Sequence, residues 1–332
     1  MIRNPGTGRA ADFEMALQPA VGRDPVADEV FARDVIAGLT ARPKRLSPKY
    51  FYDETGSRLF EEITQTAEYY PTRTELSILA ARAAEITQLF PPGAALIEFG
   101  SGSSRKVRIL LDAGRIGAYV PVDISGQRLA QEAALLKRDY PRLAVFPVAA
   151  DFTQSFRLPR PLERLPRAGF FPGSTIGNFE PAQAVAFLRH ARSMLGLGSV
   201  LVVGFDLVKD AGILNAAYND AAGITAKFNL NLLHRINREL GADFDTAGFS
   251  HQAFFDTERS RVEMHLVSRE RQRVHVCGRA IDFRGAETIH TENSYKYTVE
   301  SFGALARNAG FEAIETWTDP QQYFAVQALR SR

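Results

Sequence analysis

The sequence predicts an α/β protein in which a parallel sheet, covered by helices on both faces, is interrupted by an α+β insertion. Three observations support this prediction. Nearly all-apolar runs alternate with amphipathic helices between residues 94 and 207. A Gly/Ser turn at 100–104 joins the first apolar run to a helical pattern, and residues 251–283 change to a polar/apolar alternation. Buried parallel strands need helical crossovers, whereas alternation indicates antiparallel strands with one covered face.

Composition limits the classes of function. The chain has 332 residues, a net charge of +2 and 45% hydrophobic residues, and this balance gives no reason to expect nucleic acid or an anionic membrane as a partner. The single Cys277 cannot form an internal disulfide, and no run reaches the roughly 20 apolar residues of a membrane helix. We therefore expect a cytoplasmic protein without a membrane or nucleic-acid partner, and we expect a monomer.

The N-terminal part is expected to begin with a flexible leader over residues 1–29, because no periodicity persists there. Helical spacing follows over 30–39. The basic run Arg42-Pro43-Lys44-Arg45 is expected to be a solvated connector.

A tyrosine-rich segment follows this connector. Residues 53–56 are typical of a turn, Ser57 of a helix N-cap, and Pro71 is expected to hold Tyr70 extended. The tyrosines at 50, 52, 69 and 70 fit either a small core or hydroxyl groups that line a pocket.

The predicted sheet and its helices come next. Helices are expected at 75–89, 106–112, 127–140 and 181–195, and strands at 94–99, 118–124, 143–149, 169–173 and 199–207.

The insertion follows the fifth strand. A helix over 225–240 ends at Gly241, and 268–270 is a candidate hairpin turn. A helix at 298–307 and strands at 313–316 and 323–328 would complete the first sheet. We therefore predict one domain formed by 30–71 and 209–296, which includes the insertion, and a sheet domain formed by 72–208 and 297–332.

The turn after the first strand is the predicted ligand loop. In Glu98-x-Gly100-Ser101-Gly102, glycines allow close approach of a ligand, and backbone N–H groups at a helix start favour an anionic or nucleotide-like group. Arg105 stands where a dinucleotide fingerprint has its third glycine, which argues against NAD or FAD. The form is typical of S-adenosylmethionine (SAM) methyltransferases.

Polar residues at the carboxyl ends of the strands are the other candidates, because ligands bind at that edge of an open parallel sheet. Asp123 is placed to accept both hydroxyls of a ribose, and Asp151 and Phe152 to contact an adenine. Lys106 is placed to pair with a carboxylate of the same ligand. Asn178 either caps the helix at Pro181 or faces a methyl acceptor.

Seven segments, taken together, resemble one known family; they are 50–53, 68–73, 98–102, 173–178, 206–210, 263–264 and 291–294. In this order and spacing, residues 46–332 closely resemble the L-histidine Nα-methyltransferases of ergothioneine biosynthesis. The resemblance implies a Rossmann-like class I methyltransferase sheet with an inserted α+β substrate-binding domain. It also implies that SAM donates three methyl groups to the amino nitrogen of L-histidine, giving hercynine.

The resemblance also implies the site residues. It assigns Gly100, Lys106, Asp123, Asp151 and Phe152 to SAM; Tyr69, Asn178 and Tyr218 to the backbone groups of histidine; Met264, Glu292 and Ser294 to the imidazole; and Tyr52 and Phe60 to the surroundings of the amine.

Methyl transfer from a sulfonium is an in-line displacement that needs alignment and exclusion of water, so we expect no metal and no covalent nucleophile. A glutamate at position 292 would accept an imidazole N–H and favour the doubly protonated ring, while Ser294 serves the other nitrogen. Tyr52 is the candidate catalytic base, with water as the alternative. Two other functions stay open: methylation of another small amine or aromatic amino acid, such as a prenylated tryptophan, and a non-catalytic SAM or nucleotide sensor.

Overall fold

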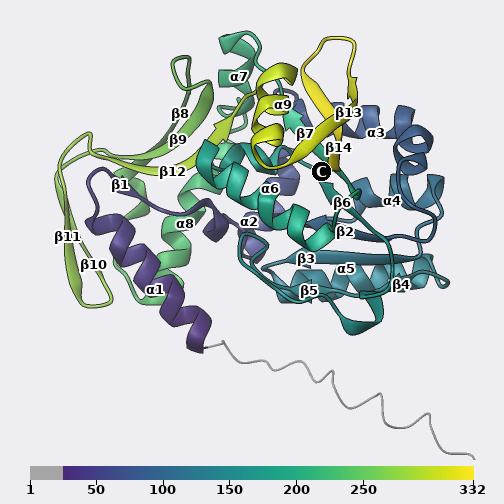
Figure 1. The fold of residues 1–332 in the computed structure, drawn as a ribbon. Coiled ribbons are helices and arrows are strands. Elements are labelled where there is room, and N and C mark those ends of the chain that lie inside the picture. Colours follow the sequence, from purple (N-terminus) through teal and green to yellow (C-terminus); the bar gives the residue numbers. More distant parts are fainter. Residues whose placement is uncertain (1–24) are drawn as a thin grey trace, which may run out of the picture.

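The computed structural model describes residues 25–332 and contains two main sheets, which Figure 1 shows on opposite sides of the molecule. The larger sheet has eight strands, six of them parallel, and its order is β13-β14-β7-β6-β2-β3-β4 with β5 also beside β3. Its strands are β2 (Ala95–Phe99), β3 (Ala118–Asp123), β4 (Ala144–Val145), β5 (Val148–Ala149), β6 (Arg167–Phe171), β7 (Val200–Asp206), β13 (Phe311–Thr318) and β14 (Phe324–Ser331). The predicted α/β class is confirmed.

Helices cover both faces of this sheet. The apolar sides of α3 (Pro71–Gln88), α4 (Arg105–Ala113) and α5 (Gly126–Asp139) share one core with the strands, and α6 (Pro181–Leu195) and α9 (Val299–Asn308) share the other. Alternate residues of β2 enter the two cores, since Ile97 packs on one face and Leu96 on the other. From β2 the chain runs outward in both directions, to β3 and to β6, so the loop after β2 lies at a topological switch point.

The second sheet has four strands in the order β1-β12-β9-β8, namely β1 (Lys44–Arg45), β12 (Thr288–Tyr295), β9 (Arg261–Ser268) and β8 (Phe249–Asp256). One core joins it to α1 (Pro25–Thr40), the 3₁₀ turn η1 (Pro48–Phe51), α2 (Glu54–Ile63), α7 (Ala211–Ala217) and α8 (Ile224–Leu240). Figure 1 shows α1 and α8 beside this sheet. Segments that lie up to more than 240 residues apart in sequence, such as β1 and β12, therefore build one lobe around the second sheet.

The insertion, residues 209–296, is joined to the large sheet by two chain crossings, and these lie next to each other. Leu207, just after β7, forms a parallel bridge with Tyr297, just after β12. The Val208 N–H donates to the carbonyl of Tyr297 at 2.9 Å, and the Tyr297 N–H donates to the carbonyl of Asp206 at 3.0 Å. The insertion therefore leaves and re-enters the large sheet at one point.

Several local predictions at the N-terminal side were wrong. Lys44 and Arg45 are not a solvated connector, because they pair in parallel with β12 and the Lys44 ammonium is buried against Glu287. Helix α2 is capped by Asp53, whose carboxylate accepts the Gly56 N–H at 2.7 Å, so Ser57 is not the cap.

The extended conformation expected for Tyr70 was also wrong, because this residue has helical dihedral angles (φ −73°, ψ −28°) although it precedes a proline. Tertiary contact outweighs the local preference here, since its buried hydroxyl donates to Asp206. The expected leader 1–29 lies outside the described residues up to position 24, and helix α1 begins at Pro25.

Two predictions in the rest of the chain also need correction. The expected strand 143–149 is split into β4 and β5, which pair with β3 at separate places. The expected hairpin turn at 268–270 is a connection between separate sheets, because β10 (Gln272–Val276) pairs with β11 (Arg279–Phe283) around Cys277 and Gly278. Both turn residues have positive φ, as tight two-residue hairpins require. Within residues 25–332, none of the helices combines the length and hydrophobicity of a membrane span.

A buried glutamate joins α3 to the edge of the large sheet. Glu75 is fully buried, accepts the Gly173 N–H at 2.9 Å and pairs with the Lys106 ammonium at 2.6 Å. It fits only because position 204 in β7 is glycine, since a Cβ there would lie 2.0 Å from Glu75 Oε1.

Gly204→Ala is expected to displace Glu75 and lower the free energy of unfolding by about 3 kcal/mol or more, because a buried carboxylate would lose its partners. Urea unfolding followed by circular dichroism measures this loss. Gly303→Ala in α9 is the control, because a Cβ there makes only an ordinary 3.6 Å contact with Arg307. This change should raise the free energy of unfolding by roughly 0.5–1 kcal/mol. Equal stabilities of the two variants would contradict the packing role of Gly204.

Candidate active site

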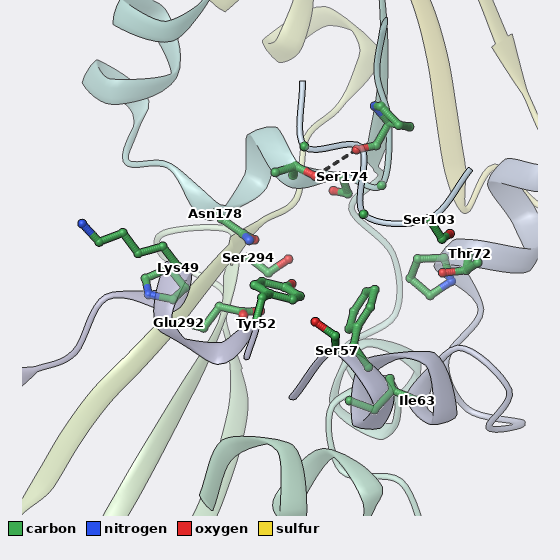
Figure 2. Close-up of a pocket in the computed structure, with 18 of the residues that line it drawn as sticks. Lys49, Tyr52, Ser57, Ile63, Thr72, Ser103, Ser174, Asn178, Glu292 and Ser294 are labelled. Atoms are coloured by element: carbon green, nitrogen blue, oxygen red, sulfur yellow. Dashed lines mark hydrogen bonds between the residues drawn. The ribbon is translucent and has the colours of Figure 1, made fainter. Parts of the chain in front are cut away.

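A cavity of about 1040 Å³ lies between the two sheets and is lined from both. Every residue assigned to the site from the sequence lines it, namely Tyr52, Phe60, Tyr69, Gly100, Lys106, Asp123, Asp151, Phe152, Asn178, Tyr218, Met264, Glu292 and Ser294. Figure 2 shows Tyr52, Asn178, Glu292 and Ser294 around this space, with Ser103 from the loop after β2 also at its wall. The fold therefore brings the Gly-rich loop and the insertion to one space.

The loop after β2 is shaped by its glycines and by Asp123. Gly100 has φ +73°, and a Cβ there would lie 3.2 Å from the Phe152 ring. Asp123, at the end of β3, accepts the Gly102 N–H at 3.1 Å and the Ser125 N–H at 2.9 Å. The carboxylate thus holds the loop in place and still lines the cavity, where lone pairs can accept hydroxyl groups of a ligand.

Asp151 and Phe152 follow β5 on the same side of the cavity. Asp151 Oδ1 accepts the N–H of Thr153 at 2.9 Å, which fixes the turn. The Phe152 ring lies 5.7 Å from Phe171 and 5.9 Å from Phe187, edge to face in both cases. This aromatic wall offers a flat apolar surface for a planar group.

Lys106 and Glu98 lie under the loop and line the cavity. The Lys106 ammonium is paired with Glu75, a partner that the sequence did not reveal, so any ligand carboxylate would share this lysine. Glu98 is buried and accepts a hydrogen bond from the Tyr119 hydroxyl. Burial raises the pKa of Glu98 to about 8, despite the opposing effects of Tyr119 and Lys106.

The opposite wall comes from the inner face of the smaller sheet. Glu292 on β12 is directly opposite Met264 on β9, and Ser294 lies two residues further on the same face. The alternation predicted from the sequence is therefore correct. Among residues 25–332, no group donates a hydrogen bond to the Glu292 carboxylate. Burial raises the pKa of Glu292 to about 7, and the charge of Lys296 only partly offsets this effect.

Because the pKa of Glu292 is raised in the folded protein, ionisation of this group lowers the free energy of unfolding. Its folded pKa of about 7 lies above the ordinary 4.5, so the ligand-free protein loses stability as pH rises between these values. At about pH 8, Glu292→Gln is expected to be more stable than the wild type by up to about 3 kcal/mol, and this gap should close near pH 5. Urea unfolding at both pH values tests it. Glu258→Gln, in the exposed β8–β9 turn, is the control; a pH-independent gap for Glu292→Gln would contradict the prediction.

Aromatic side chains close the space between the two walls. The Tyr52 ring lies 5.8 Å from Phe60, and the Tyr69 ring lies 6.4 Å from Tyr218. Burial raises the pKa of Tyr52 far above its usual value, so its hydroxyl keeps its proton at neutral pH.

Asn178 ends the 3₁₀ turn η3 (Thr175–Asn178) and lines the cavity. Glu180 and Gln183 form the capping box of α6, so Asn178 is not the cap.

A buried ionic network behind this wall was missed by sequence reasoning. Asp206, at the end of β7, accepts hydrogen bonds from Tyr70, Lys209 and Lys296 at 2.7–2.9 Å. The resemblance includes the segment 206–210 but implies no role for these residues. The only sequence signal was the presence of charged residues beside apolar strands, and their partners lie up to 139 residues away.

One cluster of possible metal ligands lies away from the cavity. The donor atoms of Glu263, His265 and His290 lie within 4.8 Å of one another on the outer face of β9 and β12. Arg261 donates to Glu263 Oε1 at 2.5 Å, and His265 Nε2 lies 2.8 Å from Oε2. Both carboxylate oxygens are therefore already paired within the protein.

The chain is similar to proteins of known function along most of its length. The family model of histidine-specific, SAM-dependent methyltransferases matches residues 31–331. The chain is 43% identical over 311 residues to the histidine N-alpha-methyltransferase of Mycolicibacterium smegmatis (90% of this chain, 94% of that protein). It is 42% identical over 304 residues to the protein of the same name from Mycobacterium tuberculosis (89% and 92%). It is 30% identical over 311 residues to ergothioneine biosynthesis protein 1 of Neurospora crassa, covering 87% of this chain and 34% of that protein.

Proposed function

Since the chain belongs to the family of histidine-specific, SAM-dependent methyltransferases, we propose that it transfers three methyl groups from SAM to the α-amino nitrogen of L-histidine. The product is hercynine, an intermediate of ergothioneine biosynthesis. One observation carries the proposal: the carboxylate of Glu292, which accepts no hydrogen bond from residues 25–332, lines the same cavity as Gly100 and Asp123. A buried acceptor of this kind suits a ligand that brings its own N–H, as an imidazole does.

Each half of the cavity has its own role in this proposal. Residues 72–208 and 297–332 hold SAM, with Asp123 at the ribose, Asp151 and Phe152 at the adenine, and Gly100 and Lys106 at the methionine part. Residues 30–71 and 209–296 hold histidine. There, Tyr69 and Tyr218 hold the amino acid's backbone groups, joined by Asn178 from the other half, and Met264 with Glu292 and Ser294 holds the ring. The two ligands thus meet where the two halves join.

The residues near the amine align it and exclude water. Each transfer forms an N–C bond and breaks an S–C bond, leaving S-adenosylhomocysteine, and three protons leave an ammonium substrate over three transfers. Because the pKa of Tyr52 is raised by burial, its hydroxyl serves better as an oriented lone-pair acceptor than as a phenolate base. We therefore propose that Tyr52 orients the amine and that water in the cavity takes the proton. This chemistry needs no metal.

Mass spectrometry of products tests the proposal. Purified protein incubated with SAM should convert histidine, but not tryptophan or a prenylated tryptophan, to a product three methyl groups heavier, and treatment with a chelator should not change the yield. Methylation of another amine while histidine is unreacted would show a different substrate. SAM binding without any turnover would indicate a sensor. In either case the proposal fails.

We propose that L-histidine and SAM are the only partners of the protein, which binds neither nucleic acid nor a membrane. We further propose that it is a cytoplasmic monomer.

A further inference from the structure

The hydrogen bonds around Ser294 determine what this residue can offer to a ligand. Its Oγ accepts the Tyr218 hydroxyl at 2.7 Å and the Lys296 ammonium at 2.9 Å. A serine hydroxyl has two lone pairs and one hydrogen. Since both lone pairs are occupied from within the protein, only the hydrogen is left to point into the cavity that Ser294 lines.

Hydrogen bonds from all three of its N–H groups hold the Lys296 side chain in one position beside Ser294. Its side chain is 1% exposed, and its three N–H groups are directed to Asp206 at 2.8 Å, Tyr218 at 3.0 Å and Ser294 at 2.9 Å. An ammonium has three donors and no acceptor, so every hydrogen is used. Asp206 is itself held by Tyr70 and Lys209. A rotation of Lys296 would therefore leave a buried charge without a partner.

We infer that Lys296 and Tyr218 fix Ser294 as a hydrogen-bond donor, so that histidine binds with a neutral imidazole whose one N–H faces Glu292. The inference rests on the proposed function and specifies the ring form that the site selects. The unprotonated ring nitrogen accepts from Ser294, and the protonated nitrogen donates to the Glu292 carboxylate. An imidazolium would instead direct a second N–H at a serine oxygen that has no free lone pair. Sequence reasoning alone favoured that doubly protonated ring, and the Lys296 network argues against it.

The charges around the ring lead to the same result. The ionisable groups facing it or coupled to it are Tyr52, Tyr69, Tyr70, Asp123, Asp206, Lys209, Tyr218, Glu292 and Lys296. The positive charge closest to Glu292 is the buried ammonium of Lys296. An imidazolium would place a second positive charge near this ammonium, whereas a neutral ring adds no charge there.

Nitrogen NMR of bound histidine tests the ring form directly. The full chain, saturated with S-adenosylhomocysteine, is mixed with ring-¹⁵N-labelled histidine at about pH 6, where most free imidazole is protonated. We expect two widely separated nitrogen resonances, as for a neutral ring with one protonated nitrogen. Two similar resonances, as for imidazolium, would overturn the inference while hercynine formation in a parallel sample leaves the proposed function intact. If histidine neither binds nor reacts, the proposed function fails and the ring assignment with it.

Lys296→Met tests the positioning role, with Lys209→Met as the matched control. Both remove one ammonium from Asp206, but only Lys296 contacts Ser294. In the wild type and in Lys209→Met, histidine affinity should fall by up to about 100-fold for each pH unit below 6.5, because both the ring and the Glu292 carboxyl, whose pKa lies near 7, must lose a proton before they pair. In Lys296→Met the affinity should fall only about tenfold per pH unit, since Ser294 regains a lone pair and the ring can keep its proton. If that variant does not fold, Tyr218→Phe removes the other donor to Ser294 and should flatten the same profile. An unchanged profile in a folded variant would overturn the role of the donor removed.

Discussion

Histidine affinity is expected to fall by about 100-fold in Glu292→Ala, because removal of a buried, charged hydrogen-bond partner costs on the order of 2–3 kcal/mol. SAM affinity should change less than about twofold, since no SAM group is assigned to this wall. Calorimetric titration with each ligand measures both constants. The essential result is the difference between the two losses of affinity, because it follows from the division of the cavity between two lobes.

Glu263→Ala is the matched control for this experiment. Glu263 is on the neighbouring strand and lies opposite Asn293, so its side chain is on the outer face of the same sheet. Its removal disturbs the sheet without removing a group from the cavity. If Glu263→Ala and Glu292→Ala weakened histidine binding equally, or if Glu292→Ala weakened both ligands equally, the imidazole role of Glu292 would be wrong.

The opposite asymmetry is expected for Asp123→Ala. This change removes the carboxylate proposed for the ribose and also frees the Gly102 and Ser125 N–H groups that it holds. SAM affinity should fall by about 100-fold through the loss of charged hydrogen bonds and of loop order. Histidine affinity, measured in the absence of SAM, should stay within about threefold of the wild type.

Asp112→Ala provides the comparison for Asp123→Ala. Asp112 is an exposed carboxylate on α4 that hydrogen-bonds Tyr140 and does not line the cavity. Its removal should leave the affinity for SAM unchanged. A normal SAM affinity in Asp123→Ala would remove the basis for placing the ribose at the end of β3.

The features of the site that follow from regular residue spacing could be predicted from sequence. The two-residue period places Glu292 and Ser294 on one face of a strand, and this is how β12 presents them. The alternation of apolar runs and helices predicts the parallel sheet, and a polar residue at the end of a strand, such as Asp123, reaches the edge where ligands bind. These features depend on local spacing, which the sequence contains directly.

The parts that depend on distant partners could not be predicted. Tyr70 takes a helical conformation before a proline because of a hydrogen bond to Asp206, 136 residues away. Lys44 was expected in solvent, yet it is buried by pairing with a strand more than 240 residues later. Similarly, nothing near Lys296 in the sequence indicates Asp206 as its partner. Pairings across such separations are determined by the completed fold, which local patterns do not contain.

The bridge between Leu207 and Tyr297 has a consequence for how such proteins diversify. Because the insertion leaves and re-enters the large sheet through neighbouring residues, its substrate-contacting residues can change while the strands of the large sheet keep their pairing. A preference for a different methyl acceptor can thus arise by substitutions within the insertion. β1 and the N-terminal helices, which share its core, and residues of the sheet domain that its strands contact, such as Asp206 and Glu180, must change along with it.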